Sequence, residues 1–141
     1  MIKSHKLPDD IMSRLPEAGS YLDSLPEVVF AYLFGSLARD KPAPLSDVDI
    51  ALYLSGPCDP AEQKLRILGD LMRILETDEI DLILLNTASL PLKARIVAQK
   101  RILTDKDPFL RHRFESLVLR EYFDFSIRET DILSRRYGLG R

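Results

Sequence analysis

The chain has 141 residues, of which 45% are hydrophobic and 30% charged, a composition typical of a folded globular protein and not of a disordered one. It contains no apolar run near the ~20 residues that a membrane-spanning helix requires, and its first ten residues lack the apolar stretch of a secretory signal. We therefore expect a cytoplasmic protein with no membrane partner, folded as one domain over residues 1–141.

The formal charge of −2 conceals a split along the chain. Residues 1–92 carry 8 basic and 15 acidic residues, a net of −7, whereas residues 93–141 carry 12 basic and 7 acidic residues, a net of +5. This asymmetry excludes a uniformly basic nucleic-acid-binding surface, and we expect no direct nucleic-acid binding. It is consistent with two surfaces that meet different partners, or with ordinary solvated helices.

Hydrophobic spacing and turn residues predict alternating helices and strands. In chain order they predict a helix over 9–25, a strand over 28–34, a loop over 40–45, a strand over 47–54, a helix of about four turns from Asp59-Pro60, a strand over 80–85, a short helix near 89–99, a strand over 101–104 and a helix from about Asp107. Pro16 is expected to split or kink the first helix. This alternation indicates an α/β or α+β domain with a small sheet flanked by helices, in an order that the sequence leaves open.

Two longer helices carry apolar stripes that we expect to face the core. The stripe on the helix from Asp59-Pro60 consists of Leu65, Leu68, Leu71, Met72 and Leu75. The stripe on the last helix consists of Phe114, Val118, Tyr122 and Phe125, and we interpret Tyr122, Phe123 and Phe125 as core packing of which an exposed part meets a partner.

Two aspartates are out of place on the apolar strand over 47–54. Asp47 and Asp49 lie two residues apart, so their side chains point to the same side of the strand. Two carboxylates ~4 Å apart repel by about 4 kcal/mol at an effective dielectric constant near 20. A divalent cation with oxygen ligands, Mg²⁺ or Mn²⁺, is the natural compensation. Asp81, near the start of the strand over 80–85, adds a third carboxylate if the two strands are neighbours, and three carboxylates suit two metal ions that act in phosphoryl transfer.

Gly35-Ser36 follows the strand over 28–34 and permits a tight turn with close approach to a ligand. If Ser36 opens a short helix, its N–H and hydroxyl groups point at an anion. Arg39 is then near a phosphate, or it is simply a surface residue. The spacing Gly-Ser, ten residues, Asp-x-Asp arises by chance in a chain of this length roughly twice in a thousand, so we favour a functional origin.

This pattern resembles the signature of the DNA polymerase β-like nucleotidyltransferase superfamily, with Asp81 similar to its third catalytic carboxylate. The chain length and the segments YLFGSLAR, SDVDIAL, DLILLN and LREYFDF resemble the minimal nucleotidyltransferases of the MntA type, which are antitoxins of HEPN/MNT toxin–antitoxin pairs. Asp40, after Arg39, departs from the glycine that this family prefers.

The resemblance implies a mixed sheet flanked by helices and Mg²⁺-dependent transfer of AMP from ATP to a tyrosine of a HEPN-domain toxin (HepT-like), which neutralises the toxin in a hetero-oligomer of the type VII-like class. By this resemblance Asp47, Asp49 and Asp81 hold the metal ions and are catalytic. The nucleotide-binding residues that it implies are Gly35, Ser36, Arg39 and Ser46.

Two other functions remain open from the sequence. The first is adenylylation of a small hydroxylated molecule such as an aminoglycoside, although 141 residues leave little room for a second substrate-binding domain. The second is a non-catalytic antitoxin that acts by binding alone, although three clustered aspartates would have no function in such a protein.

The basic residues of the last helix are either a solvated face or a docking surface for an acidic protein or a nucleic acid. They are Arg111, Arg113, Arg120, Arg128, Arg135 and Arg136. If these arginines form a docking surface, we expect that reversing the charge of Arg111, Arg113 and Arg120 weakens partner binding and leaves ATP and metal binding unchanged.

Overall fold

The computed structural model describes residues 7–39, 47–57 and 59–137, with side chains described as far as residue 132. In chain order the elements are α1 (Ile11–Ser24), β1 (Val28–Phe34), the 3-10 helix η1 (Leu37–Arg39), β2 (Val48–Leu54), α2 (Pro60–Leu75), β3 (Ile80–Leu84), α3 (Leu90–Gln99), β4 (Arg101–Asp105) and α4 (Pro108–Tyr137). The predicted helices and strands are confirmed, with ends that differ by one or two residues. The loop predicted over 40–45 lies outside the described residues.

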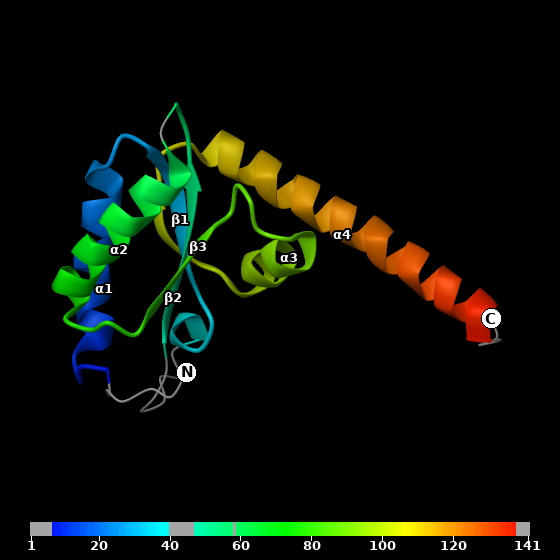
Figure 1. The fold of residues 1–141 in the computed structure, drawn as a ribbon, viewed down its shortest axis with the longest axis horizontal. Helices are drawn as coiled ribbons and strands as arrows, with labels where there is room; N and C mark the ends of the chain where they lie inside the picture. The colour runs from blue at the N-terminus through cyan, green and yellow to red at the C-terminus, as the bar shows by residue number, and fades with distance from the viewer. Residues whose placement is uncertain (1–6, 40–46, 58, 138–141) are drawn as a thin grey trace.

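The four strands form one mixed sheet in the order β3-β2-β1-β4. β1 is antiparallel to both β2 and β4, whereas β2 and β3 are parallel and are joined through α2. In Figure 1 the sheet is seen nearly edge-on, with α1 and α2 on one side and α3 and the beginning of α4 on the other. The fold is therefore the α/β arrangement that the sequence predicts, with the strand order added by the structure.

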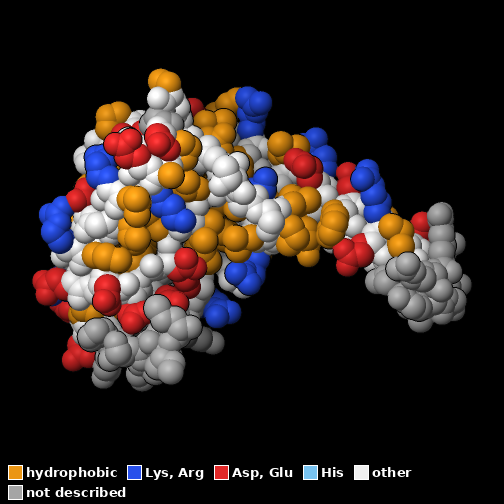
Figure 2. Space-filling model, in the orientation of Figure 1, with side chains coloured by type: hydrophobic (Ala, Val, Ile, Leu, Met, Phe, Trp, Pro, Cys, Tyr) orange, Lys and Arg blue, Asp and Glu red, His pale blue; other side chains and the backbone are white. Residues whose placement is uncertain are grey.

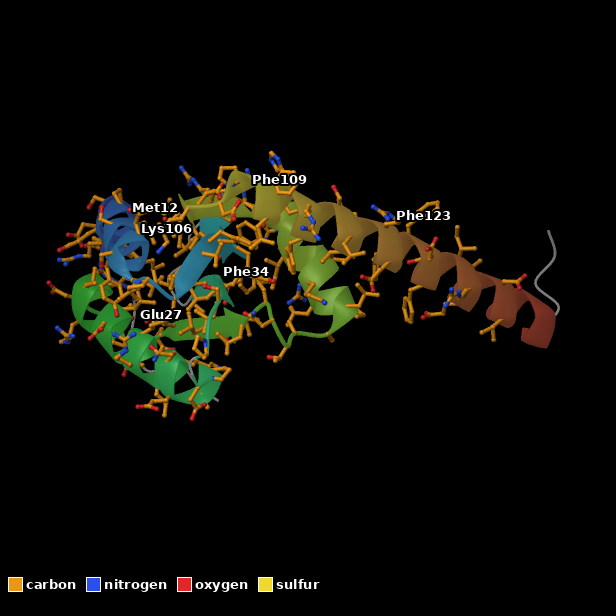
Figure 3. All side chains as sticks on the ribbon, turned by 90° about the horizontal axis from the view of Figure 1, so that it is seen from above. Met12, Glu27, Phe34, Lys106, Phe109 and Phe123 are labelled. Atoms are coloured by element: carbon orange, nitrogen blue, oxygen red, sulfur yellow. The ribbon has the colours of Figure 1, made fainter. Side chains whose placement is uncertain are left out.

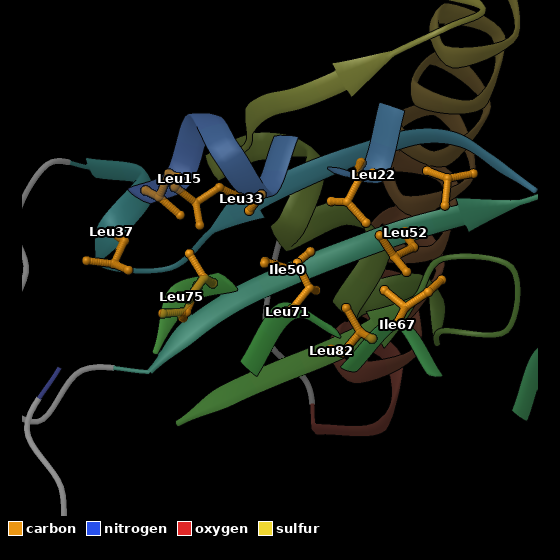
Figure 4. Close-up of a cluster of buried hydrophobic side chains, with 14 of the residues drawn as sticks. Leu15, Leu22, Leu33, Leu37, Ile50, Leu52, Ile67, Leu71, Leu75 and Leu82 are labelled. Atoms are coloured by element: carbon orange, nitrogen blue, oxygen red, sulfur yellow. The ribbon is translucent and has the colours of Figure 1, made fainter. Parts of the chain in front are cut away.

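The larger core lies between the sheet and the helices α1 and α2. Val48, Ile50 and Leu52 of β2 point into it, as the alternation of that strand predicts, and Leu15 and Leu22 of α1 meet them (Figure 4). The predicted stripe on α2 is wrong at one position: Leu65 is 72% exposed, and Ile67 is fully buried in its place. The apolar stripe of α2 is thus rotated so that Ile67, Leu71 and Leu75 face the sheet.

Local sequence explains where the helices begin. Asp59 caps α2 by accepting a hydrogen bond from the backbone N–H of Ala61 at 3.1 Å, with Pro60 in the first position. Ser89 caps α3 in the same way, through the N–H of Leu92. Of the two expectations for Pro16, a split of the first helix is wrong, because α1 is one continuous helix with Pro16 inside it, whereas a kink stays a prediction. Its interior lacks one backbone donor there, and the burial of the helix against the core offsets that loss.

On its other face the sheet carries a smaller, largely aromatic core. Phe30 of β1 stacks on Tyr53 of β2, with ring centroids 4.8 Å apart. Phe114 of α4 meets both rings, at 5.6 Å from Phe30 and 5.5 Å from Tyr53, and Ile96 of α3 completes the cluster. These contacts attach the first half of α4 to the sheet.

Arg111 is buried, so both interpretations of this residue, as part of a solvated face or of a docking surface, are wrong. Its side chain donates to Asp105 at 2.7 Å and to Glu115 at 3.1 Å, and only 9% of the residue is exposed. Glu115 also accepts a hydrogen bond of 2.5 Å from Tyr32 of β1. Burial alone would raise the pKa of Glu115, but the hydrogen bonds from Tyr32 and Arg111 outweigh it and hold that pKa below its usual range. This network fixes the orientation of α4 on the sheet.

The C-terminal part of α4 projects beyond the body of the protein (Figure 1), although Leu119 and Tyr122 still lie beside α3. Tyr122, Phe123 and Phe125 are 37%, 65% and 43% exposed, so their interpretation as core packing is wrong. A helix of 30 residues is about 45 Å long, so α4 extends beyond the sheet against which its first turns pack. Figure 3 shows Phe123 on this projecting part, well away from Phe34 in the body. Among the described residues, no helix combines the length and the apolar character needed to cross a membrane.

Candidate active site

Three strand ends meet at one edge of the sheet. β1 ends at Phe34, and both β2 and β3 begin at this edge. Asp49 pairs with Phe34 on one side and with Asp81 on the other, so the two aspartates lie in register on neighbouring parallel strands. Neighbouring strands are about 4.8 Å apart, which brings these two residues side by side. The condition under which the sequence predicts a carboxylate cluster, that the two strands are neighbours, is met.

The aspartates lie on the aromatic face of the sheet. In β2, Asp49 alternates with Val48 and Ile50, which point into the larger core, and so shares its side of the strand with Ala51 and Tyr53. Asp47 directly precedes β2 and is partly exposed, as is Asp49, whereas Asp81 is exposed. The carboxylates therefore lie at the rim of the sheet, where solvent and a ligand have access to them.

Gly35 makes the turn that follows β1, and its conformation is one that other residues rarely adopt, with φ of +74°. A Cβ atom at this position would lie 2.2 Å from Oδ2 of Asp49 and 3.2 Å from its Cγ. No side chain fits in that space, so the glycine lets the carboxylate of Asp49 lie directly against the backbone. The sequence predicts close approach of a ligand at Gly35, which stays a prediction; the group that the structure places against Gly35 is the carboxylate of Asp49.

Ser36 directly precedes, and Arg39 ends, the short helix η1 that the sequence predicts after the turn. Leu37 is fully buried in the larger core and anchors η1, and the N–H of Arg39 donates to the carbonyl of Ser36 at 3.2 Å. Ser36 is partly exposed and Arg39 is exposed at the end of η1. Ser46 lies outside the described residues. The structure thus brings Gly35 and Ser36 to the edge that carries the aspartates, and leaves the predicted contacts of Arg39 and Ser46 as predictions.

The donor chemistry of this edge fits a hard divalent cation. Asp47, Asp49 and Asp81 offer only carboxylate oxygens, which Mg²⁺ and Mn²⁺ prefer. The pocket that Gly35 leaves beside Asp49 keeps that carboxylate at the edge. As their side chains stand, no three Asp, Glu, His or Cys residues of the described segments are grouped to hold a metal ion. The fit therefore rests on the strand register and the type of donor, and a bound ion would draw the carboxylates together.

Sequence reasoning missed Glu79, a fourth acidic residue at this edge. Its carbonyl accepts the N–H of Val48 at 2.9 Å, which places it beside the beginning of β2, and only 6% of the residue is exposed. Glu79 directly precedes β3, two residues before Asp81. The Glu-Ile-Asp spacing repeats the Asp-Val-Asp spacing of residues 47–49, a signal that was available in the sequence.

Comparison with known proteins agrees with this geometry. The family model described as polymerase beta, nucleotidyltransferase, matches residues 17–109, which include both strands and the turn. No curated protein matches the chain significantly.

Several solved structures share the fold. A toxin–antitoxin structure with AMP-PNP has a chain that is 23% identical, with a TM-score of 0.70 over 85% of this chain and 96% of that one. A chain from the complex of a tri-AMPylated Shewanella oneidensis HEPN toxin with MNT antitoxin is 21% identical, with a TM-score of 0.66 over 89% and 97%. A chain from an MntA–HpeT mutant, in which two aspartates two positions apart are replaced by glutamate, is 22% identical, with a TM-score of 0.66 over 92% of this chain and 98% of that one.

At these identities the structural matches show the shared fold, and the family model supplies the relationship in sequence. It covers well over half of the chain and spans Gly35, Asp49 and Asp81. The chain belongs to the polymerase beta nucleotidyltransferase family.

Proposed function

We propose that this protein transfers AMP from ATP to a tyrosine hydroxyl of a HEPN-domain toxin, and thereby acts as the antitoxin of the pair. The observation that carries the proposal is the row of Gly35, Asp49 and Asp81 across three adjacent chain segments at one edge of the sheet. Membership of the nucleotidyltransferase family supports the reaction class. The fold shared with toxin–antitoxin structures, one with AMP-PNP and one with an AMPylated toxin, supports the choice of ATP and of the partner.

The reaction is a displacement at the α-phosphorus. The acceptor oxygen forms a bond to this phosphorus, the bond to the oxygen that bridges the α- and β-phosphates breaks, pyrophosphate leaves, and the hydroxyl proton passes to solvent. Asp47, Asp49 and Asp81 would hold Mg²⁺, as two ions. Bound Mg²⁺ supplies positive charge for the triphosphate and makes the acceptor hydroxyl more acidic.

The protein's own part is to orient these groups. The turn at Gly35-Ser36 would hold the β- and γ-phosphates through backbone N–H groups and the Ser36 hydroxyl, which stabilises the leaving pyrophosphate. Arg39 and Ser46 would add further contacts to the nucleotide. Because Asp81 is exposed at the rim, a tyrosine on the surface of another protein has access to the carboxylates.

The test uses the purified protein, its HEPN-domain partner, Mg²⁺ and ATP labelled at the α- or the γ-phosphate. The proposal predicts that only the α-label reaches the partner, and that peptide mapping finds it on tyrosine. Asp49→Asn should lower the rate by at least about 100-fold, since it removes one charged group from the reacting centre.

The matched control is Asp124→Asn, which removes an exposed carboxylate from the projecting part of α4 and should leave the rate unchanged. Label from the γ-phosphate, or equal labelling by Asp49→Asn, would contradict the proposal. Pyrophosphate release that responds to an aminoglycoside and not to the partner protein would instead favour a small-molecule acceptor.

A further inference from the structure

A groove of about 620 Å³ lies along the first half of α4, beside Tyr53 of β2 and apart from the carboxylate edge. Tyr53 and Phe114 line its inner side, and Phe109 and Leu117 of α4 are among its outer residues. Arg113 and Arg120 also line it and are its charged side chains, and His112 lies beside Arg113. Figure 3 shows Phe109 at the beginning of α4, where this helix joins the body.

The inner side of the groove is held in place by its neighbours. Tyr53 is stacked on Phe30 with an angle of 13° between the ring planes, and Phe114 meets Tyr53 edge-on. The buried ion pairs of Arg111 with Asp105 and Glu115 hold α4 at the position that forms the other side. A groove built from packed rings and a fixed helix is formed before anything binds, so little conformational entropy is lost on binding.

The apolar residues along the groove are unusually exposed. Phe109 is 73% exposed and Leu117 is 50% exposed, on the same helix whose continuation bears exposed aromatic side chains. Figure 2 shows hydrophobic side chains on the surface along this helix and where it meets the body. Contiguous exposed apolar surface bordered by polar residues is typical of an interaction site.

Charge determines which partner fits. Among the described residues, those that line the groove include two arginines and one histidine and no aspartate or glutamate, in a chain with a formal charge of −2. The guanidinium of Arg113 lies over the ring of Phe109, 5.9 Å from its centroid, at the edge of the apolar surface. An occupant that combines an apolar anchor with acidic groups would satisfy both features. A second copy docked through the same groove would bring the arginines of the two copies together, which is unfavourable.

We propose that this groove binds an acidic segment with an apolar anchor on the protein that accepts the nucleotide. The proposal rests on the proposed function, because it assigns a docking surface to the same partner. Tyr53 and Asp49 point to the same face of the sheet and lie four residues apart on β2, about 13 Å at ~3.3 Å per residue. A protein seated in the groove is therefore held on the side of the sheet that bears the carboxylates.

The test measures the affinity of the HEPN-domain partner for the full chain by titration calorimetry. The double variant Arg113→Glu/Arg120→Glu should weaken binding by more than about tenfold and make the remaining affinity less sensitive to salt. Phe109→Ser, which removes an exposed ring and so spares the fold, should weaken binding without changing its salt dependence. The matched control, Lys64→Glu/Arg73→Glu, makes the same change in charge on α2, which covers the opposite face of the sheet, and should leave the affinity unchanged.

Three results would overturn the proposal. The first is wild-type affinity in both groove variants. The second is a dimer of this chain alone that both groove variants dissociate, which would assign the groove to a second copy. The third is binding of an RNA that the arginine variant abolishes and Phe109→Ser does not, which would assign the arginines to phosphates. Groove-dependent binding of the partner without nucleotide transfer would support the docking site and contradict only the proposed function.

Discussion

Replacing Gly35 by alanine tests whether the turn after β1 exists to accommodate the carboxylate of Asp49. The new Cβ would lie 2.2 Å from Oδ2 of Asp49, well inside contact distance. Because that oxygen is at the end of a rotatable side chain, the carboxylate can turn away from the methyl group. The fold is then retained, but the carboxylate of Asp49 is displaced from its position in the site.

The expected magnitudes follow from two separate effects. An alanine at φ of +74° costs about 1–2 kcal/mol of folding free energy, because the left-handed conformation crowds its Cβ. Displacing a metal-binding carboxylate costs about 10–100-fold in activity or metal affinity, the range found when the support of a ligand is removed. Gly35→Ala should therefore lose much more activity than its modest loss of stability explains.

Gly56→Ala is the matched control. Gly56 has φ of +85°, so alanine suffers the same backbone strain there, but a Cβ atom would meet nothing within 4 Å. The free energies of unfolding, from urea denaturation, should fall by similar amounts in the two variants, whereas nucleotide transfer should fall only in Gly35→Ala. Equal activity of the two variants would refute the reasoning.

Three further predictions follow from the site and from the buried network. Asp81→Asn should lower nucleotide transfer by at least about 100-fold with little change in the free energy of unfolding, because its side chain is exposed; an unchanged rate would remove Asp81 from the site. Arg111→Met should destabilise the fold by about 3 kcal/mol, as it leaves Asp105 without its buried cation and Glu115 with Lys100 alone; a stability equal to that of the wild type in urea denaturation would contradict this. The folded-state pKa of Glu115 lies below its usual value of 4.5, so this group stabilises the fold above that pH and the contribution is lost as the pH falls below it. The drop in stability on acidification below pH 4.5 should accordingly be smaller in Glu115→Gln than in the wild type, as followed by circular dichroism.

Much of the fold follows from local patterns in the sequence. Runs of β-branched and aromatic residues mark β1 and β2, and an aspartate followed by proline marks the beginning of α2. Strand alternation alone places Asp47 and Asp49 on one side of β2. Their proximity to Asp81 depends on strand order, which a local pattern does not contain, although a parallel connection through α2 is the common way to join such strands.

The wrong predictions share one physical cause, which is tertiary packing. Arg111 and Arg113 are the same residue type two positions apart on one helix, yet Arg111 is buried and Arg113 is exposed. Glu115, four residues after Arg111, was the signal for an internal ion pair. Tyr122 and Phe125 continue the spacing of Phe114 and Val118, but the sheet ends before α4 does.

The most direct test of the account is whether neutralisation of the toxin requires the carboxylates. Cells that express the HEPN-domain toxin are provided with the wild-type chain or with Asp47→Asn/Asp49→Asn, at equal amounts of folded protein, and their growth is measured. If the chain neutralises its partner by nucleotide transfer, the wild type restores growth and the double variant does not, although it still binds the toxin. Full protection by the double variant would show that binding alone suffices and would contradict the central claim.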